Sequence, residues 1–300
     1  MTKTGCVTCH NNSLTAATVG AVRAAGLPVD PALTATQLAG AAAAFRAQTE
    51  LLLQGVDGGA GVNGLGYTLM GLHSLGYQAD LATDAAVRSI KGGQLAEGHW
   101  GGNVSTRPPH GASRVNRTAL AIRGMQLYAP NVMRSDYDAA VRRAAAWLAQ
   151  AKARTSEEQA YRLLGLAWAR AGAHAIKAAA DELAASQRAD GGWADIASLD
   201  SGPYATGMAL VALKEAGMSS SERVYERGVA FLIRTQLADG SWFARSRSVP
   251  VQPYFDAGFP HGTDQWISSA ATNWATIALV HAAKRVPEAQ TAGAARTGAR

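Results

Sequence analysis

Gln187-Arg-Ala-Asp-Gly-Gly-Trp193 decides the fold, because the chain contains this phrase three times. The other copies are Gln94-Leu-Ala-Glu-Gly-His-Trp100 and Gln236-Leu-Ala-Asp-Gly-Ser-Trp242. The steps between the glutamines are 93 and 49 residues, so a degenerate copy is expected between the first two, and Gln150 has the right position. A unit of about 47 residues, present at least four times, indicates a repeat protein.

Each unit is predicted to be a pair of helices. The clearest example has an apolar helix over 206–216, a stop at Gly217 and a second helix over 221–236 that ends at the glutamine. Glycine is a common helix stop, and Ser221 is expected as the N-cap of the second helix. The pattern therefore predicts an all-α fold built from repeated helix pairs.

The turn after each second helix is expected to hold the repeats together. Its glycine permits positive φ, its tryptophan covers apolar surface, and its glutamine amide bonds to backbone groups left free at the helix end. We therefore assign a structural role to the two ends of the phrase, which are Gln94, Trp100, Gln187, Trp193, Gln236 and Trp242.

Composition supports a helical repeat domain and limits the partners. Apolar residues make up 48% of the chain and charged residues 17%. We expect an N-terminal segment with one helix at 1–32, the repeat domain at 33–284 and a disordered tail at 285–300. No apolar run approaches the length of a membrane span, so no transmembrane segment is expected. The net charge is +6, but the basic residues are scattered and form no nucleic-acid module, so nucleic acid is not expected as a partner.

The three copies of QxxxGxW resemble those of squalene-hopene cyclases, oxidosqualene cyclases and protein prenyltransferases. The resemblance extends to neighbouring segments such as Tyr204-Ala-Thr-Gly-Met-Ala-Leu210 and covers roughly residues 33–284. It is strongest to a bacterial group that joins such repeats to an N-terminal haem motif and has a segment like Phe259-Pro-His-Gly-Thr-Asp-Gln-Trp266. The resemblance implies an α/α toroid, in which inner helices surround a central apolar cavity.

Cys6-Val-Thr-Cys9-His10 holds both cysteines and matches the attachment pattern of c-type haem. In this pattern two thiols bind the porphyrin covalently and the adjacent histidine is an iron ligand. A structural zinc site would need a fourth ligand and a redox dithiol would not need the histidine, and both stay as alternatives. We expect covalent haem c held by Cys6, Cys9 and His10, with His10 on the iron and the sixth ligand open.

Covalent haem attachment predicts a compartment outside the cytoplasm. Only Met1 to Gly5 precede the first cysteine, which is too short for a signal peptide. We therefore expect an extracytoplasmic protein, periplasmic or secreted, whose export signal is missing from this sequence.

The catalytic motifs of the resembled families are absent. Squalene-hopene cyclases protonate their substrate with a DxDD motif just before an inner-helix threonine, where burial keeps one carboxyl protonated. The equivalent positions here precede Thr118, Thr206 and Thr272, and none carries the motif. Prenyltransferases hold zinc with Asp, Cys and His, but both cysteines of this chain lie outside the repeats. Direct acid-initiated cyclisation is therefore not supported, and whether the protein is an enzyme stays open.

A small set of polar residues remains as candidates. His261 and Asp264, in a loop rich in Pro and Gly before the last inner helix, are the candidate catalytic residues. Their alternative roles are an exposed loop histidine and an N-cap carboxylate. Asp195 and Asp200 are most simply a solvated turn.

Two arginine-bearing loops follow Gly-Trp turns at corresponding places, Arg107-Pro-Pro-His110 and the segment 245–253. We expect them to cover one end of the barrel. Their arginines are either solvated or bind carboxylates such as haem propionates or a lipid head group.

Two classes of function follow. In the first, the toroid binds an apolar isoprenoid or lipid in a cavity lined by Tyr204, Met208, Trp266 and Trp274, and the haem performs or relays oxidation. In the alternative, the protein is a c-type haem electron-transfer protein, and the toroid is a scaffold or a platform for a redox partner protein.

Overall fold

The computed structural model describes residues 9–56, 61–102, 107–111, 113–249 and 253–283. These residues form helices and three isolated β-bridges but no strand, so the all-α prediction is confirmed. The α-helices are α1 Leu14–Ala24, α2 Pro31–Arg46, α3 Thr49–Leu53, α4 Gly61–Ser74, α5 Leu81–Gly92, α6 Arg114–Tyr128, α7 Arg134–Gln150, α8 Ser156–Trp168, α9 Ala173–Ala185, α10 Pro203–Glu215, α11 Arg223–Thr235 and α12 Gln265–Ala282. Short helical turns occur at η1 Cys9–Ser13, η2 Asn131–Met133 and η3 Gly262–Asp264.

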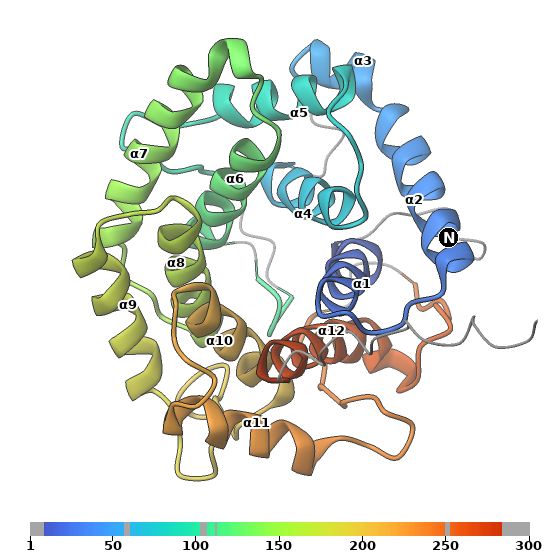
Figure 1. Cartoon of the computed structure of the whole chain (residues 1–300), viewed down its shortest axis with the longest axis vertical. Coiled ribbons are helices and arrows are strands. Elements are labelled where there is room, and N and C mark those ends of the chain that lie inside the picture. Colours follow the sequence, from blue (N-terminus) through green and yellow to red (C-terminus); the bar gives the residue numbers. More distant parts are fainter. Residues whose placement is uncertain (1–8, 57–60, 103–106, 112, 250–252, 284–300) are drawn as a thin grey trace, which may run out of the picture.

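Helices α1, α4, α6, α8, α10 and α12 form a closed inner ring, in which each helix contacts the next and α12 contacts α1 (Figure 1). The remaining long helices lie outside this ring. Each of α5, α7, α9 and α11 contacts the inner helix before it and the inner helix after it, and α2 contacts α4. The double layer buries one face of every outer helix and nearly all faces of α6, α10 and α12.

Glycines let the inner helices approach closely. A Cβ atom added at Gly207 of α10 would lie 2.6 Å from the backbone nitrogen of Ala275 in α12. A Cβ atom at Gly66 of α4 would lie 2.7 Å from Cβ of Leu120 in α6. Real Cβ atoms do not approach other atoms so closely, and a larger residue at either position would push the two helices apart.

The glutamine of the repeat phrase joins one outer helix to the next. The Nε2 atom of Gln94 donates hydrogen bonds to the carbonyl oxygens of Gly98, at 2.9 Å, and Ala140 in α7, at 2.8 Å. The Nε2 atom of Gln187 makes the same pair of bonds, to Gly191 at 2.9 Å and to Val224 in α11 at 2.8 Å. In the last copy, Gln236 donates to Gly240 at 3.0 Å.

The tryptophan of the phrase joins its outer helix to the following inner helix. Trp100, Trp193 and Trp242 are at most 1% exposed, and each indole nitrogen donates to the carbonyl oxygen ten residues earlier, at 2.6–2.8 Å. Each tryptophan backbone nitrogen also donates to a threonine hydroxyl of the next inner helix. These threonines are Thr118 at 3.4 Å, Thr206 at 2.9 Å and Thr272 at 3.0 Å. The turns therefore lie beside the N-terminal halves of the inner helices.

The degenerate copy lacks the Gly-Trp turn and has a surface pocket at the end of its outer helix. Helix α7 ends at Gln150, and Arg154 and Ser156 stand where the glycine and the tryptophan would be. A surface pocket of about 460 Å³ lies beside this helix end, lined by Glu97, Ala146, Trp147, Gln150 and Ala151. The ring of Trp147 packs against His99 of the preceding turn, with 4.6 Å between the ring centroids.

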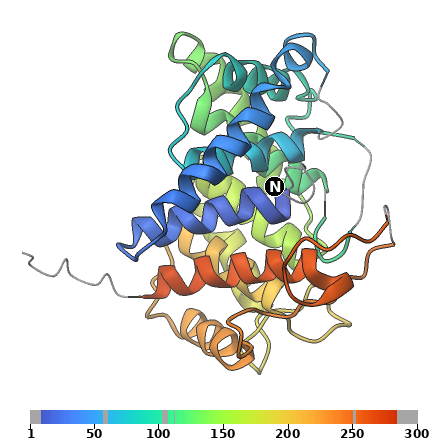
Figure 2. The same ribbon diagram turned by 90° about the vertical axis from the view of Figure 1, so that its right-hand side faces the viewer.

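The N-terminal helix belongs to the inner ring. The helix expected in the N-terminal segment is α1, and Pro31 begins α2. Helix α1 packs between α4 and α12, and it runs beside α12 across the molecule (Figure 2). Asn273 of α12 fixes this contact, because its Oδ1 accepts from the Thr18 hydroxyl at 2.7 Å. Helix α1 therefore completes the ring, while the expected tail lies outside the described residues.

Two further details bear on the predictions. The N-cap of α11 is Glu222 and not Ser221, because the Ser221 hydroxyl bonds to that of Ser219 at 2.8 Å instead of to the helix. None of the described helices combines the length and the apolarity needed to cross a bilayer.

Candidate functional site

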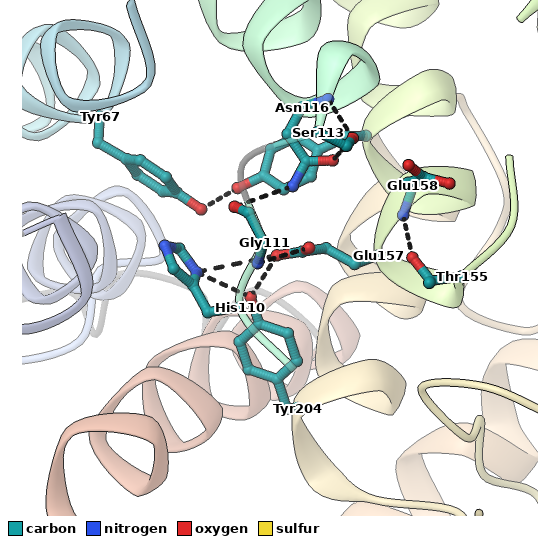
Figure 3. Close-up of polar contacts among 10 residues, drawn as sticks. Tyr67, His110, Gly111, Ser113, Asn116, Thr155, Glu157, Glu158 and Tyr204 are labelled. Atoms are coloured by element: carbon teal, nitrogen blue, oxygen red, sulfur yellow. Dashed lines mark hydrogen bonds and ion pairs between the residues drawn. The ribbon is translucent and has the colours of Figure 1, made fainter. Parts of the chain in front are cut away.

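The N-terminal ends of the inner helices bring together a buried polar cluster. Helix α6 supplies Asn116, α8 supplies Glu157, and α10 supplies Tyr204. The loop before α6 adds His110 and Gly111 (Figure 3). We call these five residues the Glu157 cluster.

Glu157 is at the centre of the cluster and is 7% exposed. Its Oε1 accepts a hydrogen bond from the Tyr204 hydroxyl at 2.8 Å, and its Oε2 accepts one from the backbone nitrogen of Gly111 at 2.8 Å. The Nδ1 atom of His110 lies 3.1 Å from the Tyr204 hydroxyl oxygen and 3.8 Å from Oε1 of Glu157. Both carboxyl oxygens therefore have donors, and an ionisable imidazole is close by.

Local sequence explains how Glu157 reaches this place. Thr155 is the N-cap of α8, and its hydroxyl accepts from the backbone nitrogen of Glu158 at 3.1 Å, which leaves Glu157 in the first turn facing the cluster. Gly111 lies opposite, and a Cβ atom there would lie 2.5 Å from Oε2 of Glu157, so a larger residue would have to displace the carboxyl. The side chain of Asn116 holds the loop by donating to the carbonyl oxygen of Gly111 at 3.3 Å.

Further aromatic hydroxyls surround the cluster. Tyr67 of α4 and Tyr161 of α8 are each 1% exposed and share a hydrogen bond between their hydroxyl groups. The rings of Tyr67 and His110 are 5.6 Å apart between centroids. Four of the six inner helices thus contribute polar groups to the same end of the ring.

Burial gives Glu157 an unusual protonation behaviour. Burial raises the pKa of Glu157 to about 7, although hydrogen bonds from Gly111, Asn116 and Tyr204 act in the opposite direction. The negative charge of Asp195 also raises it. Burial raises the pKa of Tyr204 well above its ordinary value, and the adjacent Glu157 adds to this, so the phenol stays protonated as a donor. Glu157 can therefore either give or take a proton near neutral pH.

An ion pair lies behind the cluster. The Nη2 atom of Arg247 is 2.7 Å from Oδ2 of Asp195, and the backbone nitrogen of Arg247 donates to the carbonyl oxygen of Pro108 at 3.1 Å. Burial raises the pKa of Asp195, whereas Arg247 lowers it. The two arginine-bearing loops therefore meet at the same end of the ring, as the sequence predicts. Of the two aspartates expected in a solvated turn, Asp195 is paired with Arg247 and Asp200 is exposed.

The two candidate catalytic residues make their contacts elsewhere. The Nε2 atom of His261 is 2.9 Å from the Ser241 hydroxyl, which in turn donates to Asp239 at 2.6 Å. Asp264 is the residue before α12, but its Oδ1 accepts from the backbone nitrogen of Ser246, at 2.7 Å, instead of capping the helix. In the described part of the chain, their hydrogen bonds hold the loop of residues 239–246 and do not reach Glu157.

The four residues expected to line a cavity lie on α10 and α12. Tyr204, Met208 and Trp274 are 2%, 0% and 3% exposed, and Trp266 is half-buried. Tyr204 is part of the Glu157 cluster, and Met208 lies one turn further along α10. In this structure the first three side chains are packed in the interior.

The haem motif is only partly described. Cys6 lies outside the described residues, and Cys9 and His10 belong to η1, a π-helical turn that leads into α1 and contacts α4 and α12. Among the described residues, no group of three or more His, Cys, Asp or Glu side chains is arranged to hold a metal ion.

Glu157 was not predicted from the sequence. Acidic residues were expected just before an inner-helix threonine, but α8 follows the degenerate copy and has no such threonine. The signal that could have found it is Thr155-Ser-Glu-Glu158, a helix start placed where an inner helix must begin.

Comparison with models of known protein families and with curated proteins finds no match to this chain. Its function therefore rests on the chemistry of its own residues.

Proposed function

We propose that the chain is an α/α toroid of the cyclase and prenyltransferase type that binds an apolar isoprenoid or lipid and transfers protons through Glu157. The closed inner ring and the outer helices that bridge it support the toroid, as do the bonds made by the repeated Gln and Trp residues.

The single observation that carries the reaction is the buried Glu157 carboxyl, whose two oxygens accept hydrogen bonds and whose pKa burial raises to about 7. A perturbed acid with a histidine beside it is a common sign of a proton-transfer site. Nδ1 of His110, 3.8 Å from Oε1, is placed to exchange a proton with Glu157.

The chemistry of the site bears on the type of reaction. Glu157 is not part of a DxDD motif like that with which cyclases protonate an alkene, so acid-initiated cyclisation is disfavoured. The Glu157 carboxyl, with a pKa of about 7, suits reversible proton transfer at a carbon next to a carbonyl group, for which a pKa close to the working pH is best. We therefore assign double-bond migration or a related isomerisation of a carbonyl-bearing isoprenoid or lipid.

In this reaction, the Glu157 carboxylate takes a proton from a carbon next to the carbonyl. The electron pair of the broken C–H bond moves into the carbonyl group and gives an enolate. Return of the same proton to a different carbon shifts the double bond and restores the carboxylate. The bonds from Tyr204 and Gly111 hold the carboxyl in one orientation throughout.

Haem c is the proposed cofactor. Residues 9–13 form a helical turn continuous with α1, and the spacing of Cys6, Cys9 and His10 in the sequence is that of the c-type attachment pattern. Cys6 and Cys9 would hold the haem and His10 its iron, and when bound the group supplies one-electron transfer. Covalent attachment implies that the protein works outside the cytoplasm.

The scaffold function is the second candidate, and one observation favours it. Tyr204, Met208 and Trp274 are at most 3% exposed, so the interior at these residues is filled by the protein's own side chains. In that case the haem would exchange electrons with a partner protein, and the Glu157 cluster would only stabilise the ring.

Turnover separates the two functions. Haem-loaded protein should be incubated with C15 to C30 isoprenoids, some carrying a carbonyl group separated from a double bond by one CH₂ group and some being hydrocarbons. We expect isomerisation of the carbonyl compounds only, with a rate reduced about 100-fold or more in Glu157→Gln, as is typical for loss of a general acid or base.

Glu158→Gln is the matched control, because Glu158 is the neighbouring residue and bonds to the backbone of Arg154 outside the cluster. It should keep the activity. Full activity in Glu157→Gln would contradict the role of this carboxyl. If the protein neither binds nor converts any of these compounds, the scaffold function is favoured.

A further inference from the structure

The segment Trp193–Asp195 contacts the starts of the two helices that supply Glu157 and Tyr204. The Asp195 carbonyl oxygen accepts from the backbone nitrogen of Ser156 at 3.0 Å, directly before Glu157. The Ser156 hydroxyl donates to the Ala194 carbonyl oxygen at 2.5 Å. The first turn of α8 is therefore fastened to this segment at two points.

The same segment also fixes the start of α10. The carbonyl oxygen of Trp193 accepts from the backbone nitrogen of Gly202 at 2.9 Å, and Ala194 forms an isolated antiparallel bridge with Ser201. Tyr204 follows two residues after Gly202. Both hydrogen-bonded partners across the cluster, Glu157 and Tyr204, are thus held by residues 193–195.

Arg247 links this segment to the loop that carries His110 and Gly111. Its backbone nitrogen bonds to the Pro108 carbonyl oxygen at 3.1 Å, and its guanidinium pairs with the Asp195 side chain at 2.7 Å. The side chains of Asp195 and Arg247 are 19% and 32% exposed. A pair with this much shielding is more strongly coupled than a fully solvated one, and this pair links two loops that are far apart in the sequence.

We propose that Asp195 and Arg247 are positioning residues of the Glu157 site, which hold the His110 loop against the carboxyl and fix the charge that the carboxyl faces. This role deepens the proposed function and rests on it. Asp195 acts on Glu157 through its bond to Ser156 and through its charge, and Arg247 acts through Asp195 and Pro108, so neither is assigned direct contact with substrate.

The electrostatic part of the proposal depends on every charged or titratable group around Glu157. These groups are His110 from the loop, Tyr204 from α10, Tyr161 from the same helix, Asp195 from residues 193–195, and Arg247 behind it. Asp195 contributes a negative charge, and Arg247 offsets it. Removing one member of the pair should therefore act on Glu157 in the opposite direction from removing the other.

The test is a titration of the Glu157 carboxyl carbon by NMR in protein labelled with ¹³C at glutamate, without any substrate. In Asp195→Asn, the negative charge is lost and Arg247 is uncompensated, so the pKa of Glu157 should fall. In Arg247→Gln, the Asp195 charge is uncompensated, so the pKa should rise. We expect shifts of about one unit, at the lower end for a nearby charge.

A merely structural role gives a different result. If the two substitutions only loosened the loops, water would reach Glu157 in both variants and both pKa values would move down towards the ordinary value. Shifts in the same direction, or no shift in either variant, would overturn the proposal. Arg247→Lys and Asp195→Glu keep the charges and should restore most of the wild-type titration, which guards against variants that fold poorly.

The matched control is the exposed pair Lys177 and Asp181 on α9, 2.6 Å apart. Lys177→Gln and Asp181→Asn should leave the Glu157 titration unchanged. Because this test needs no substrate, its failure is distinct from failure of the proposed reaction, which only the turnover assay measures.

Discussion

Replacement of Glu157 by glutamine should change how the stability of the protein depends on pH. Burial raises the pKa of Glu157 to about 7 in the folded protein, from 4.5 as its ordinary value. Below pH 4.5 the carboxyl is protonated in both the folded and the unfolded chain. Between pH 4.5 and 7 the unfolded chain gives up this proton and the folded chain keeps it, so the stability present at low pH is lost as the pH rises.

The magnitude follows from the size of the shift. Each pKa unit corresponds to about 1.36 kcal/mol, and a shift of about 2.5 units therefore corresponds to about 3 kcal/mol. The free energy of unfolding of the wild type should fall by about this amount, relative to Glu157→Gln, between pH 4.5 and pH 8. Titrating groups far from the cluster contribute equally to both proteins, so the difference between the two proteins reports on Glu157 and the groups coupled to it.

The assay is urea unfolding of both proteins at several pH values, followed by circular dichroism. Glu158→Gln is the control and should follow the wild type, because Glu158 is outside the cluster. Parallel stability curves for the wild type and Glu157→Gln would refute the reasoning, since they would mean that Glu157 titrates alike in the folded and unfolded chains.

Three other predictions concern the ring and the haem. Trp193→Ala should lower the free energy of unfolding by about 3–5 kcal/mol, as other buried aromatic truncations do. Trp147 lies in the degenerate copy and is half-buried, so Trp147→Ala should cost less than half as much. Similar losses at both sites would contradict the role of the repeat turn. Gly207→Val should force α10 away from α12 and lower the thermal midpoint of unfolding by several degrees. Gly217 has open space around it but a positive φ, so Gly217→Ala should cost only about 1 kcal/mol. Equally small losses of stability in the two variants would count against the close approach of the two helices. The haem is tested in protein exported from a cell competent for c-type maturation. The double variant Cys6→Ala, Cys9→Ala should lose the covalent haem seen in a pyridine haemochrome spectrum, and His10→Ala should alter the iron spectrum. Wild-type protein without covalent haem would contradict the haem assignment.

The helix pairs were predictable because the repeat phrase fixes a local physical unit. A glycine that ends a helix, a tryptophan that must be covered and a glutamine that must find backbone partners lead to the same turn in each copy. The sequence pattern of α1 also predicted a helix, but not its place in the ring. That place depends on contacts with α12, more than 250 residues away, such as the bond between Thr18 and Asn273.

The candidate site was less predictable, because its residues come from separate repeats. Glu157, Tyr204 and His110 have no common spacing, and only the closed ring brings them together. His261 and Asp264 stood out by their loop composition, yet their partners are the Ser241 hydroxyl and the backbone nitrogen of Ser246. A motif search anchored on threonine was bound to pass over α8, the inner helix that follows the degenerate copy.

The protonation state of Glu157 is the central claim, since both the proposed reaction and the predicted stability profile depend on it. It is tested most directly by titration of the Glu157 carboxyl carbon in the ¹³C-labelled wild-type protein, with the resonance assigned by its absence in Glu157→Gln. The account predicts a midpoint close to pH 7. A midpoint near the ordinary value of 4.5 would show that the carboxyl is already ionised at neutral pH like any exposed glutamate, and would contradict the account.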